Sequence, residues 1–287
     1  MKNILITGKN GFVGNQFQLL LNNDNYKVDR ISLKNNDWKF CSFENYDVII
    51  HLAALVHNNQ PNAKIIDYMN TNYHLTRELA KKAKDDGVSQ FIFFSTMGVF
   101  GMNGSINEKC EITQLTPYKP KSAYDYSKLL AERDIQKLIN DKFVINIVRP
   151  PMIYGKEGPG NFAKLIKVAN LSRIFPKYHN ERSVIHIDNL YKHILHLLKN
   201  EKSDITHPQN MEYMNTNTAL SLIRNHLGKS SELIEIPVPN FINKIIEKAN
   251  IANKIYGNLT YSKNIDDREI SNMHFDTFNQ TISKTLK

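Results

Sequence analysis

The chain alternates short apolar runs with stretches of helical periodicity, which is the pattern of parallel strands joined by helices. Five strands are expected, at residues 4–6, 27–33, 46–52, 90–95 and 143–148. Helices are expected over 63–86, where Leu75, Leu79 and Ala83 recur at helical spacing, and over 125–139. This order predicts an α/β protein built on a doubly wound parallel sheet.

Beyond Pro151 the apolar runs become shorter and less regular, with a strand predicted at 183–187 and helices at 161–169 and 188–199. We expect a first domain formed by 1–150 with about 184–200, and a smaller lobe formed by 151–183 and 201–287. Such a lobe would lie over the carboxyl ends of the strands, where open α/β sheets bind ligands. An amphipathic helix predicted over 241–249 either packs on its own domain, which we favour, or docks on a membrane surface.

Three glycines, Gly8, Gly11 and Gly14, follow the first strand and open the first helix. A turn with positive φ, a backbone that approaches a diphosphate, and close helix–strand packing each require glycine. The unpaired N–H groups and the dipole at a helix N-terminus favour an anion. The pattern predicts a dinucleotide site, although a tight turn without a ligand would also use glycine. The neighbouring residues expected to line it are Asn10, Phe12 and Val13.

The end of the second strand indicates which dinucleotide is bound, because a carboxylate there accepts from a ribose 2′-hydroxyl and repels a 2′-phosphate. Here the tip carries Arg30, Ser32 and Lys34 and no acid, while Asp29 is too early in the strand. This favours NADP(H) over NAD(H), which remains the alternative. A solvated edge with incidental charges is the simpler interpretation.

Tyr124 and Lys128 are four residues apart at the start of a predicted helix, so that their side chains share one face. A nearby ammonium is expected to lower the pKa of a phenol, and such a phenol can exchange a proton with a carbonyl or alcohol oxygen. Thr96, at the end of the fourth predicted strand, is expected at the same rim, able to hydrogen-bond a carbonyl. Tyr-x-x-x-Lys by itself is common in amphipathic helices, so the position after this strand is what favours catalysis.

The formal net charge of +9 comes from scattered lysines, without an arginine-rich stripe or a basic–aromatic pattern. We therefore expect no nucleic-acid partner. The excess of positive charge reflects a compositional bias toward lysine and asparagine, or it steers an anionic ligand toward the protein. The opening residues do not resemble a secretion signal and no apolar run is long enough to span a membrane. We expect a cytoplasmic protein without peripheral membrane contact, and no metal site.

The motifs TGKNGFVG (Thr7–Gly14), HLAA (His51–Ala54), FFSTMGVFG (Phe93–Gly101), YDYSK (Tyr124–Lys128) and RPPMIYG (Arg149–Gly155) occur in this order. The whole chain thus resembles the extended short-chain dehydrogenases/reductases, the nucleotide-sugar epimerases, dehydratases and ketoreductases. The resemblance implies a Rossmann fold with a nucleotide-sugar-binding lobe. The run from RPPMIYG to RSVIHIDNL (Arg182–Leu190) resembles bacterial 4-ketoreductases of capsule and O-antigen synthesis. Those enzymes reduce UDP-2-acetamido-2,6-dideoxy-4-ketohexoses to UDP-N-acetylfucosamine or UDP-N-acetylquinovosamine.

The resemblance also implies roles for individual residues. Thr96 and Tyr124 would polarise and protonate the sugar carbonyl, and Lys128 would hold the nicotinamide ribose. Further residues implied in cofactor binding are Leu52, Ala53, Ala54, Asn72, Ser95, Pro150 and Ile153. The resemblance implies that Asn161 and Arg182 bind the UDP-sugar, and Met97 and His57 are further candidates for contact with it. The family habit is a homodimer formed through the helices around 72–86 and 125–139.

The resemblance leaves a choice between reactions. Dehydratases of the family carry Asp-Glu directly after the strand-four threonine, where this chain has Met97 and Gly98, so dehydration is not expected. A 4-ketoreductase using NADPH is favoured by the missing acid on the second strand. A UDP-sugar 4-epimerase with tightly held NAD is the alternative, and a non-catalytic dinucleotide sensor is a third possibility.

Overall fold

The computed structural model describes residues 2–24, 26–56, 63–239, 251–266 and 273–287. The chain divides into two compact units. Unit 1 comprises Met1–Gly101, Tyr118–Pro150 and His193–His207, and unit 2 comprises Met102–Pro117, Pro151–Lys192 and Pro208–Lys287. These boundaries differ from the expected ones: 102–117 falls in unit 2, and the return to unit 1 lies at 193–207 because a further strand of the sheet, Asp204–Thr206, lies there.

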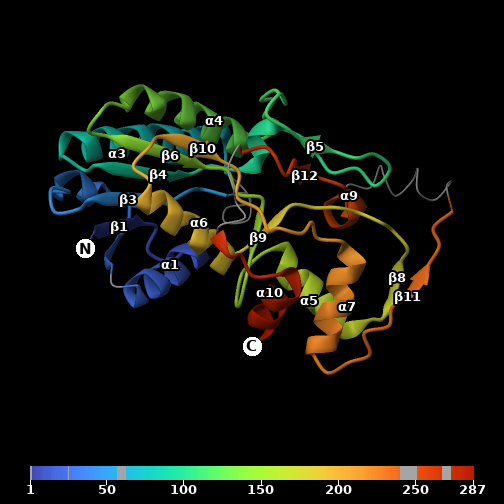
Figure 1. Ribbon diagram of the computed structural model, residues 1–287. Coiled ribbons are helices and arrows are strands. Elements are labelled where there is room, and N and C mark those ends of the chain that lie inside the picture. The colour runs from blue at the N-terminus through green and yellow to red at the C-terminus, as the bar shows by residue number, and fades with distance from the viewer. Residues whose placement is uncertain (1, 25, 57–62, 240–250, 267–272) are drawn as a thin grey trace. The chain divides into compact units, whose positions relative to one another are not determined.

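A six-stranded parallel sheet forms the centre of unit 1, in the order β10-β6-β4-β3-β1-β2 (Figure 1). Its strands are β1 (Asn3–Thr7), β2 (Lys27–Ile31), β3 (Val48–His51), β4 (Gln90–Phe94), β6 (Val144–Val148) and β10 (Asp204–Thr206). Leu5, Ile49, Phe91 and Ile145 are register partners from strand to strand, and each is almost fully buried. This continuous apolar row is typical of a sheet that is covered on both faces, and it confirms the doubly wound α/β fold.

Helices of unit 1 pack on this sheet, and residues of α3 and α4 such as Leu79, Ala83 and Ile135 join the same core. The helices are α1 (Phe12–Asn23), α2 (Ile65–Tyr68), a π-helix (Met69–His74), α3 (Leu75–Asp85) and α4 (Ala123–Ile135). Short 3₁₀ helices occupy Asn36–Phe40, Met97–Phe100 and Gln136–Leu138. The helix predicted over 63–86 therefore exists, but it contains one widened π segment.

Unit 2 is built from paired short strands and helices around its own core, which includes Tyr154, Phe162, Phe175 and Leu220. The parallel strand pairs are β7 (Met152–Tyr154) with β9 (Val184–His186), β8 (Ile174–Pro176) with β11 (Ile234–Ile236), and β5 (Glu111–Ile112) with β12 (Thr260–Tyr261). The helices are α5 (Asn161–Leu171), α7 (Thr216–His226), α9 (Ile251–Tyr256) and α10 (Phe278–Leu286), while α6 (Ile187–Lys199) runs from unit 2 into unit 1.

The amphipathic helix predicted over 241–249 lies outside the described residues. Among the helices that the structure describes, none is both long and apolar enough to cross a bilayer.

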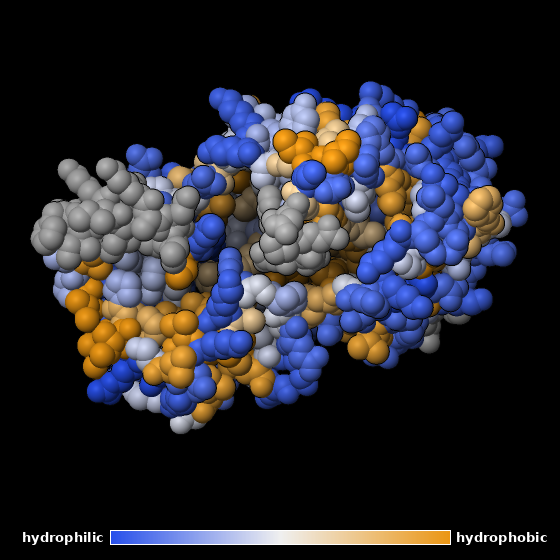
Figure 2. Space-filling view, turned by 180° about the vertical axis from the view of Figure 1, so that it is seen from behind, coloured by the Kyte–Doolittle hydropathy of each residue, from blue (hydrophilic) through white to orange (hydrophobic). Residues whose placement is uncertain are grey.

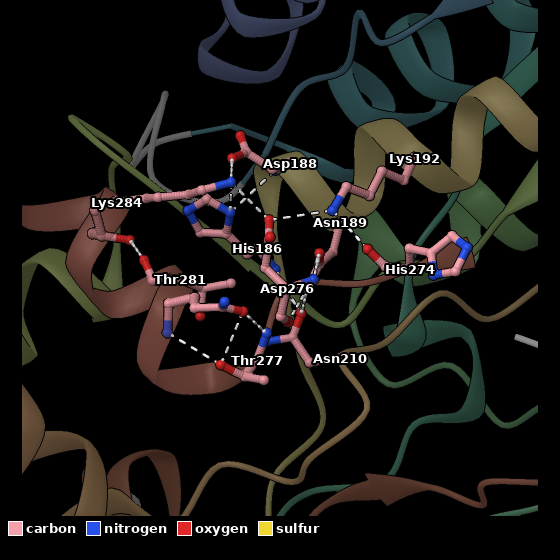
Figure 3. Close-up of polar contacts among 12 residues, drawn as sticks. His186, Asp188, Asn189, Lys192, Asn210, His274, Asp276, Thr277, Thr281 and Lys284 are labelled. Carbon is pink, nitrogen blue, oxygen red and sulfur yellow. Dashed lines mark hydrogen bonds and ion pairs between the residues drawn. The ribbon is translucent and has the colours of Figure 1, made fainter. Parts of the chain in front are cut away.

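A polar cluster ties α10 to the start of α6 in unit 2 (Figure 3). Lys284 on α10 contacts the carboxylates of Asp188 and Asp276 at 2.9 and 2.8 Å, and Lys192 lies 3.4 Å from Asp276. The Asn189 amide donates to the carbonyl of Asp276. Because these side chains come from α6, α10 and the segment before α10, the cluster fixes the C-terminal helix on its own unit.

Candidate active site

The glycine-rich turn lies between β1 and α1, and each glycine has its own structural reason. Gly8 has φ of +96°, a conformation that L-residues with side chains rarely adopt. A Cβ on Gly11, which immediately precedes α1, would meet no atom within 4 Å, whereas one on Gly14 would lie 3.0 Å from Arg30 Nη2. An open backbone at a helix N-terminus has room for a diphosphate. Asn10, Phe12 and Val13, which we expect to line such a site, flank Gly11.

Buried hydrogen bonds hold the adjoining segment, Leu52–Ala53, in place. The Thr7 hydroxyl oxygen accepts from the backbone N–H groups of Leu52 and Ala53, both at 3.2 Å, and lies 2.7 Å from His51 Nδ1. With its lone pairs engaged, the Thr7 hydroxyl must donate to Nδ1, so that His51 is protonated on Nε2 and donates to Thr76 at 2.8 Å. Burial, and then the charge of Lys128, hold the pKa of His51 well below its usual range. His51 is thus a neutral structural link.

Thr96 caps the 3₁₀ helix that follows β4, and its hydroxyl accepts from the Gly98 N–H at 3.0 Å. This bond leaves the Thr96 hydroxyl proton available for a carbonyl oxygen. At Gly98 an added Cβ would lie 1.8 Å from Asp125 Oδ1, so the Asp125 carboxylate occupies the space that a side chain would need. Asp125 is in turn held by the hydroxyl of Ser122, the N-cap of α4. The structure therefore gives a steric reason for the absence of an acid at position 98.

Tyr124 and Lys128 stand in the first turns of α4, four residues apart as expected. Lys128 is buried; its Nζ donates to the carbonyl of Phe94 at the end of β4 at 2.7 Å, and lies 4.5 Å from the centroid of the Phe93 ring. Tyr124 is partly buried. Thr96, Tyr124 and Lys128 all belong to unit 1, and Lys128 connects α4 to the strand that leads to Thr96.

The electrostatics of this pair differ from the expectation that the lysine lowers the pKa of the phenol. Burial, with a further contribution from the charge of Asp125, raises the pKa of Tyr124 above its usual value. Burial also lowers the pKa of Lys128 to about 7, although the negative charge of Glu132 opposes that shift. For Tyr124, desolvation has a larger effect on the pKa than the positive charge of Lys128, from which the spacing had predicted a lower pKa. The phenol is therefore held in its protonated form, which is the form that donates a proton.

Asn72 lies in the π-helix, fully buried, and links the Leu52–Leu55 segment to α4. Its Oδ1 accepts from the Leu55 N–H at 2.8 Å, and its Nδ2 donates to the Leu55 carbonyl at 3.0 Å and to Ser127 Oγ at 3.2 Å. Ser127 Oγ donates to the carbonyl of Tyr124 at 2.7 Å. Such π segments recur at functional sites. Here the carboxamide supports the helix that carries Tyr124.

A buried ion pair joins Glu132 of α4 to Arg149, which follows β6, and the sequence analysis did not predict it. Glu132 accepts from Arg149 Nε at 3.0 Å and from Nη2 at 2.6 Å, and both side chains are at most 2% exposed. Arg149 also donates to the Tyr118 hydroxyl at 3.1 Å. Burial alone would lower the pKa of Arg149, but the hydrogen bonds and charge of Glu132 outweigh it and raise that pKa. Glu132 is one helical turn from Lys128, and this i,i+4 spacing is the feature of the sequence that could have identified Glu132 as part of the site.

The side chains at the end of β2, where a ribose contact was expected, also make contacts within the protein. Arg30 hydrogen-bonds Asn15 Oδ1 and donates to the carbonyl of Gly8 at 2.7 Å, so its guanidinium lies over the glycine-rich turn. Ser32 Oγ accepts from the Lys34 N–H at 3.4 Å. Asp29 instead accepts from the hydroxyl of Tyr46 at 3.0 Å, consistent with its exclusion from the ribose contact.

Of the remaining expected residues, Ser95 and Pro150 lie in unit 1 near Thr96, since the Pro150 carbonyl accepts from the Met97 N–H at 3.2 Å. The Ser95 hydroxyl oxygen is buried and has no hydrogen-bond partner among the described residues. In unit 2, Ile153 lies on β7 and Asn161 begins α5. Arg182, also in unit 2, donates through Nη1 to the carbonyls of Asn253 and Gly257 at 3.2 and 2.6 Å. His57 lies outside the described residues.

Comparison with known proteins agrees with this geometry. A model of the "NAD dependent epimerase/dehydratase family" matches residues 4–212. The chain belongs to the NAD dependent epimerase/dehydratase family. It is therefore an enzyme of the extended short-chain dehydrogenase/reductase class. Its relatives and structural neighbours include epimerases, dehydratases and reductases of nucleotide sugars, some of them solved with NAD or NADP.

Two relatives within this family span most of the chain. The UDP-glucose 4-epimerase of Vibrio cholerae is 26% identical over 285 residues, covering 90% of this chain and 86% of the relative. The N-acetyl-alpha-D-glucosaminyl-diphospho-ditrans,octacis-undecaprenol 4-epimerase of Escherichia coli O157:H7 is 24% identical, covering 68% of this chain and 59% of the relative.

Solved structures of the family share the fold. A dTDP-4-dehydrorhamnose reductase from Clostridium acetobutylicum superposes with a TM-score of 0.73 at 18% identity, covering 99% of this chain and 98% of that one. The UDP-glucuronic acid 4-epimerase from Bacillus cereus, in complex with NAD, gives 0.71 at 19% identity, covering 99% and 95%.

Proposed function

We propose that this enzyme is an NADP(H)-dependent 4-ketoreductase. Its substrate would be a UDP-2-acetamido-2,6-dideoxy-4-ketohexose, reduced at C4 to UDP-N-acetylfucosamine or UDP-N-acetylquinovosamine for a surface polysaccharide. The observation that carries the proposal is that the residues expected to be catalytic belong to two adjoining segments of unit 1, the end of β4 and the start of α4. Thr96 follows β4, Tyr124 and the buried Lys128 lie at the start of α4, and Asp125 fills the space that an eliminating acid at position 98 would need.

The chemistry follows from the protonation states of these groups. NADPH, when bound, supplies a hydride to C4 of the sugar. The Tyr124 phenol donates a proton to the C4 oxygen, and the Thr96 hydroxyl hydrogen-bonds the same oxygen, so that the charge on it is stabilised without a metal. Lys128 would hold the nicotinamide ribose with the N–H groups that its bond to the Phe94 carbonyl leaves over. The product is an alcohol, because one hydride and one proton have been added across the carbonyl.

Two cations support NADP(H) over NAD(H). Arg30 uses one N–H of each Nη group for Asn15 and Gly8, which leaves further donors on the guanidinium for a 2′-phosphate. Lys34 is exposed at the same strand end, with Ser32 beside it. In unit 2, Asn161 and Arg182 would bind the nucleotide diphosphate of the sugar, a task that suits the planar arginine fork.

A second candidate is a UDP-sugar 4-epimerase with tightly bound NAD. Its support is the UDP-glucose 4-epimerase of Vibrio cholerae, which aligns over 90% of this chain. An epimerase returns the hydride to the other face of the sugar, so it consumes no cofactor.

Incubation with NADPH and a UDP-4-keto-6-deoxy sugar separates the candidates. Loss of the NADPH absorbance in proportion to sugar reduced is the expected result. Interconversion of UDP-N-acetylglucosamine and UDP-N-acetylgalactosamine without cofactor loss would establish the epimerase, and firm NADPH binding without either reaction would indicate a sensor. The Gly8–Gly14 turn serves all three, so binding alone decides nothing.

A further inference from the structure

One end of unit 2 exposes a group of aliphatic side chains, which we call the aliphatic face. Leu171 is 85% exposed, Ile174 and Ile236 are each 52% exposed, and Val168 and Ile234 are nearly half exposed. In Figure 2 hydrophobic side chains gather at the lower left, over this end of unit 2. Single exposed aliphatic residues are ordinary, but a contiguous group on a folded protein marks an interaction site.

The strand pair β8–β11 shows that this exposure follows from the fold. Ile174 pairs with Ile234, and Ile236 pairs with Pro176, so these alternate positions share the outward side of the two strands. The residues between them point the other way: Phe175 is buried in the core, and Glu235 accepts from Asn217 at 2.7 Å. The outward side of the pair is therefore entirely apolar, the reverse of the polar exposed side usual in a half-buried sheet.

Helix α5 continues the aliphatic face with a mixture of apolar and cationic residues. Lys164, Lys167, Val168 and Leu171 recur at spacings of three and four and are all exposed, so they share one side of the helix. The opposite side packs into the core through residues such as Phe162. Lysines beside aliphatic residues can lay their methylene stems along an apolar surface while the ammonium remains in water.

The charges around the aliphatic face are predominantly positive. The cations are Lys164, Lys167, Arg173, Lys177 and Lys229, and the acids are Glu232 and Glu235. Within the described ranges none of the five cations forms an ion pair. The face therefore combines apolar side chains with a net positive rim.

We propose that the aliphatic face docks on an anionic membrane surface. Aliphatic side chains would enter the boundary between headgroups and acyl chains, and the lysines would attract anionic headgroups. A second copy of the chain fits less well, because a two-fold contact would bring the same cationic rims together. The proposal departs from the expectation, drawn from the sequence, that the protein makes no peripheral membrane contact. It concerns α5 and β8–β11, not the 241–249 stretch, and it does not depend on the reaction that the enzyme catalyses.

Co-sedimentation of the whole chain with lipid vesicles tests this proposal. We expect binding to vesicles that contain phosphatidylglycerol, no binding to pure phosphatidylcholine vesicles, and weaker binding as the salt concentration rises. Leu171→Glu should weaken binding about tenfold, as expected for a leucine that no longer enters the apolar layer. Leu19→Glu, at a 62% exposed position on α1, changes the charge equally and should have little effect.

A second pair of variants tests the contribution of the cationic side chains to vesicle binding. Lys167→Glu should weaken binding about fivefold or more, whereas Lys202→Glu, at an exposed position in unit 1 outside the expected dimer helices, should not. All four substitutions are at exposed positions, so unchanged thermal melting is the check on folding.

Three results would overturn the proposal: no binding to anionic vesicles, equal losses in the Leu19 and Lys202 controls, or full binding by Leu171→Glu. Light scattering that shows dimers broken by Leu171→Glu, without vesicle binding, would assign the face to a second copy instead.

Discussion

Each unit has a charged contact that ties distant segments together, and the two contacts lie at different depths. In unit 1 the Arg149–Glu132 pair is at most 2% exposed, and the links through His51 and Asn72 are fully buried. In unit 2 the ties of Lys284 to Asp188 and Asp276 join side chains that are 46%, 28% and 18% exposed. The buried links of unit 1 surround the helix and strand that carry Tyr124, Lys128 and Thr96, while the exposed contacts of unit 2 add to buried hydrogen bonds, such as that between Tyr154 and Thr281, in holding the terminal helix.

This difference indicates where the enzyme needs geometric precision. Buried polar groups tolerate only one arrangement, because an unpaired partner is expensive to desolvate. Exposed pairs can exchange partners for water at little cost. We infer that unit 1 holds its catalytic rim rigidly, and that the polar cluster in unit 2 contributes mainly to local order.

The largest effect is expected at the catalytic rim itself. Tyr124→Phe removes the only hydroxyl of that side chain and should lower the reduction rate by about 10²–10⁴-fold, the usual contribution of a general acid. Single-turnover oxidation of NADPH with the 4-keto sugar measures it. Tyr126→Phe, at a 51% exposed position two residues away, is the matched control and should retain the rate. Equal rates in the two variants would remove Tyr124 from the chemistry.

A large loss of stability is expected when the buried pair is broken. Arg149→Met leaves Glu132 as an unpaired buried charge and should reduce the free energy of unfolding by about 3–5 kcal/mol. Urea unfolding measures the change. The double variant Arg149→Met/Glu132→Leu should recover much of it, because both charges are then absent. Additive losses in the double variant would show that the charge of Glu132 is not the cause.

Buried histidines should make the enzyme acid-sensitive. Burial lowers the pKa of His186 to about 4, although Asp188 opposes the shift, and the pKa of His51 is also well below normal. The unfolded chain binds these protons at about pH 6.5, so stability is full above that pH and is lost as the pH falls. His186 should remove about 1.5 kcal/mol between pH 6.5 and 5, and His51 should add to the loss in the same direction. Urea midpoints that do not change over this range would contradict the neutral assignment.

The smallest effect is expected in the exposed cluster. Lys284→Met should reduce the free energy of unfolding by less than about 1 kcal/mol, and high salt should reduce that difference further. Thermal melting at low and high salt provides the measurement. A loss as large as that of Arg149→Met would show that depth is not what separates the two units.

The sequence predicted five of the six strands in the sheet of unit 1, and four of them, β1, β3, β4 and β6, are mainly apolar runs. It missed β10, whose three residues include Asp204 and Thr206, and the β8–β11 pair, which joins segments about sixty residues apart in the chain. Chain-local patterns carry no information on such pairings. The π segment was equally hidden, because Met69–His74 reads as ordinary helix.

The spacing of Tyr124 and Lys128 on α4 was predictable, but the electrostatics of the two side chains were not. Spacing placed Tyr124 and Lys128 on one side of α4, and the structure agrees. Burial depends on tertiary packing, such as that of Lys128 against Phe93 and Phe94, which spacing does not reveal. The predicted direction of the Tyr124 pKa shift was therefore wrong. The bidentate contact of Glu132 with Arg149 likewise joins residues that no local motif connects.

Isotope transfer tests the central claim most directly. NADPH deuterated at the transferable position should deliver its deuterium to C4 of the sugar, and NMR of the product should show the label on that carbon in a single epimer. Retention of the label on the cofactor, while UDP-sugar epimers interconvert, would contradict the reductase.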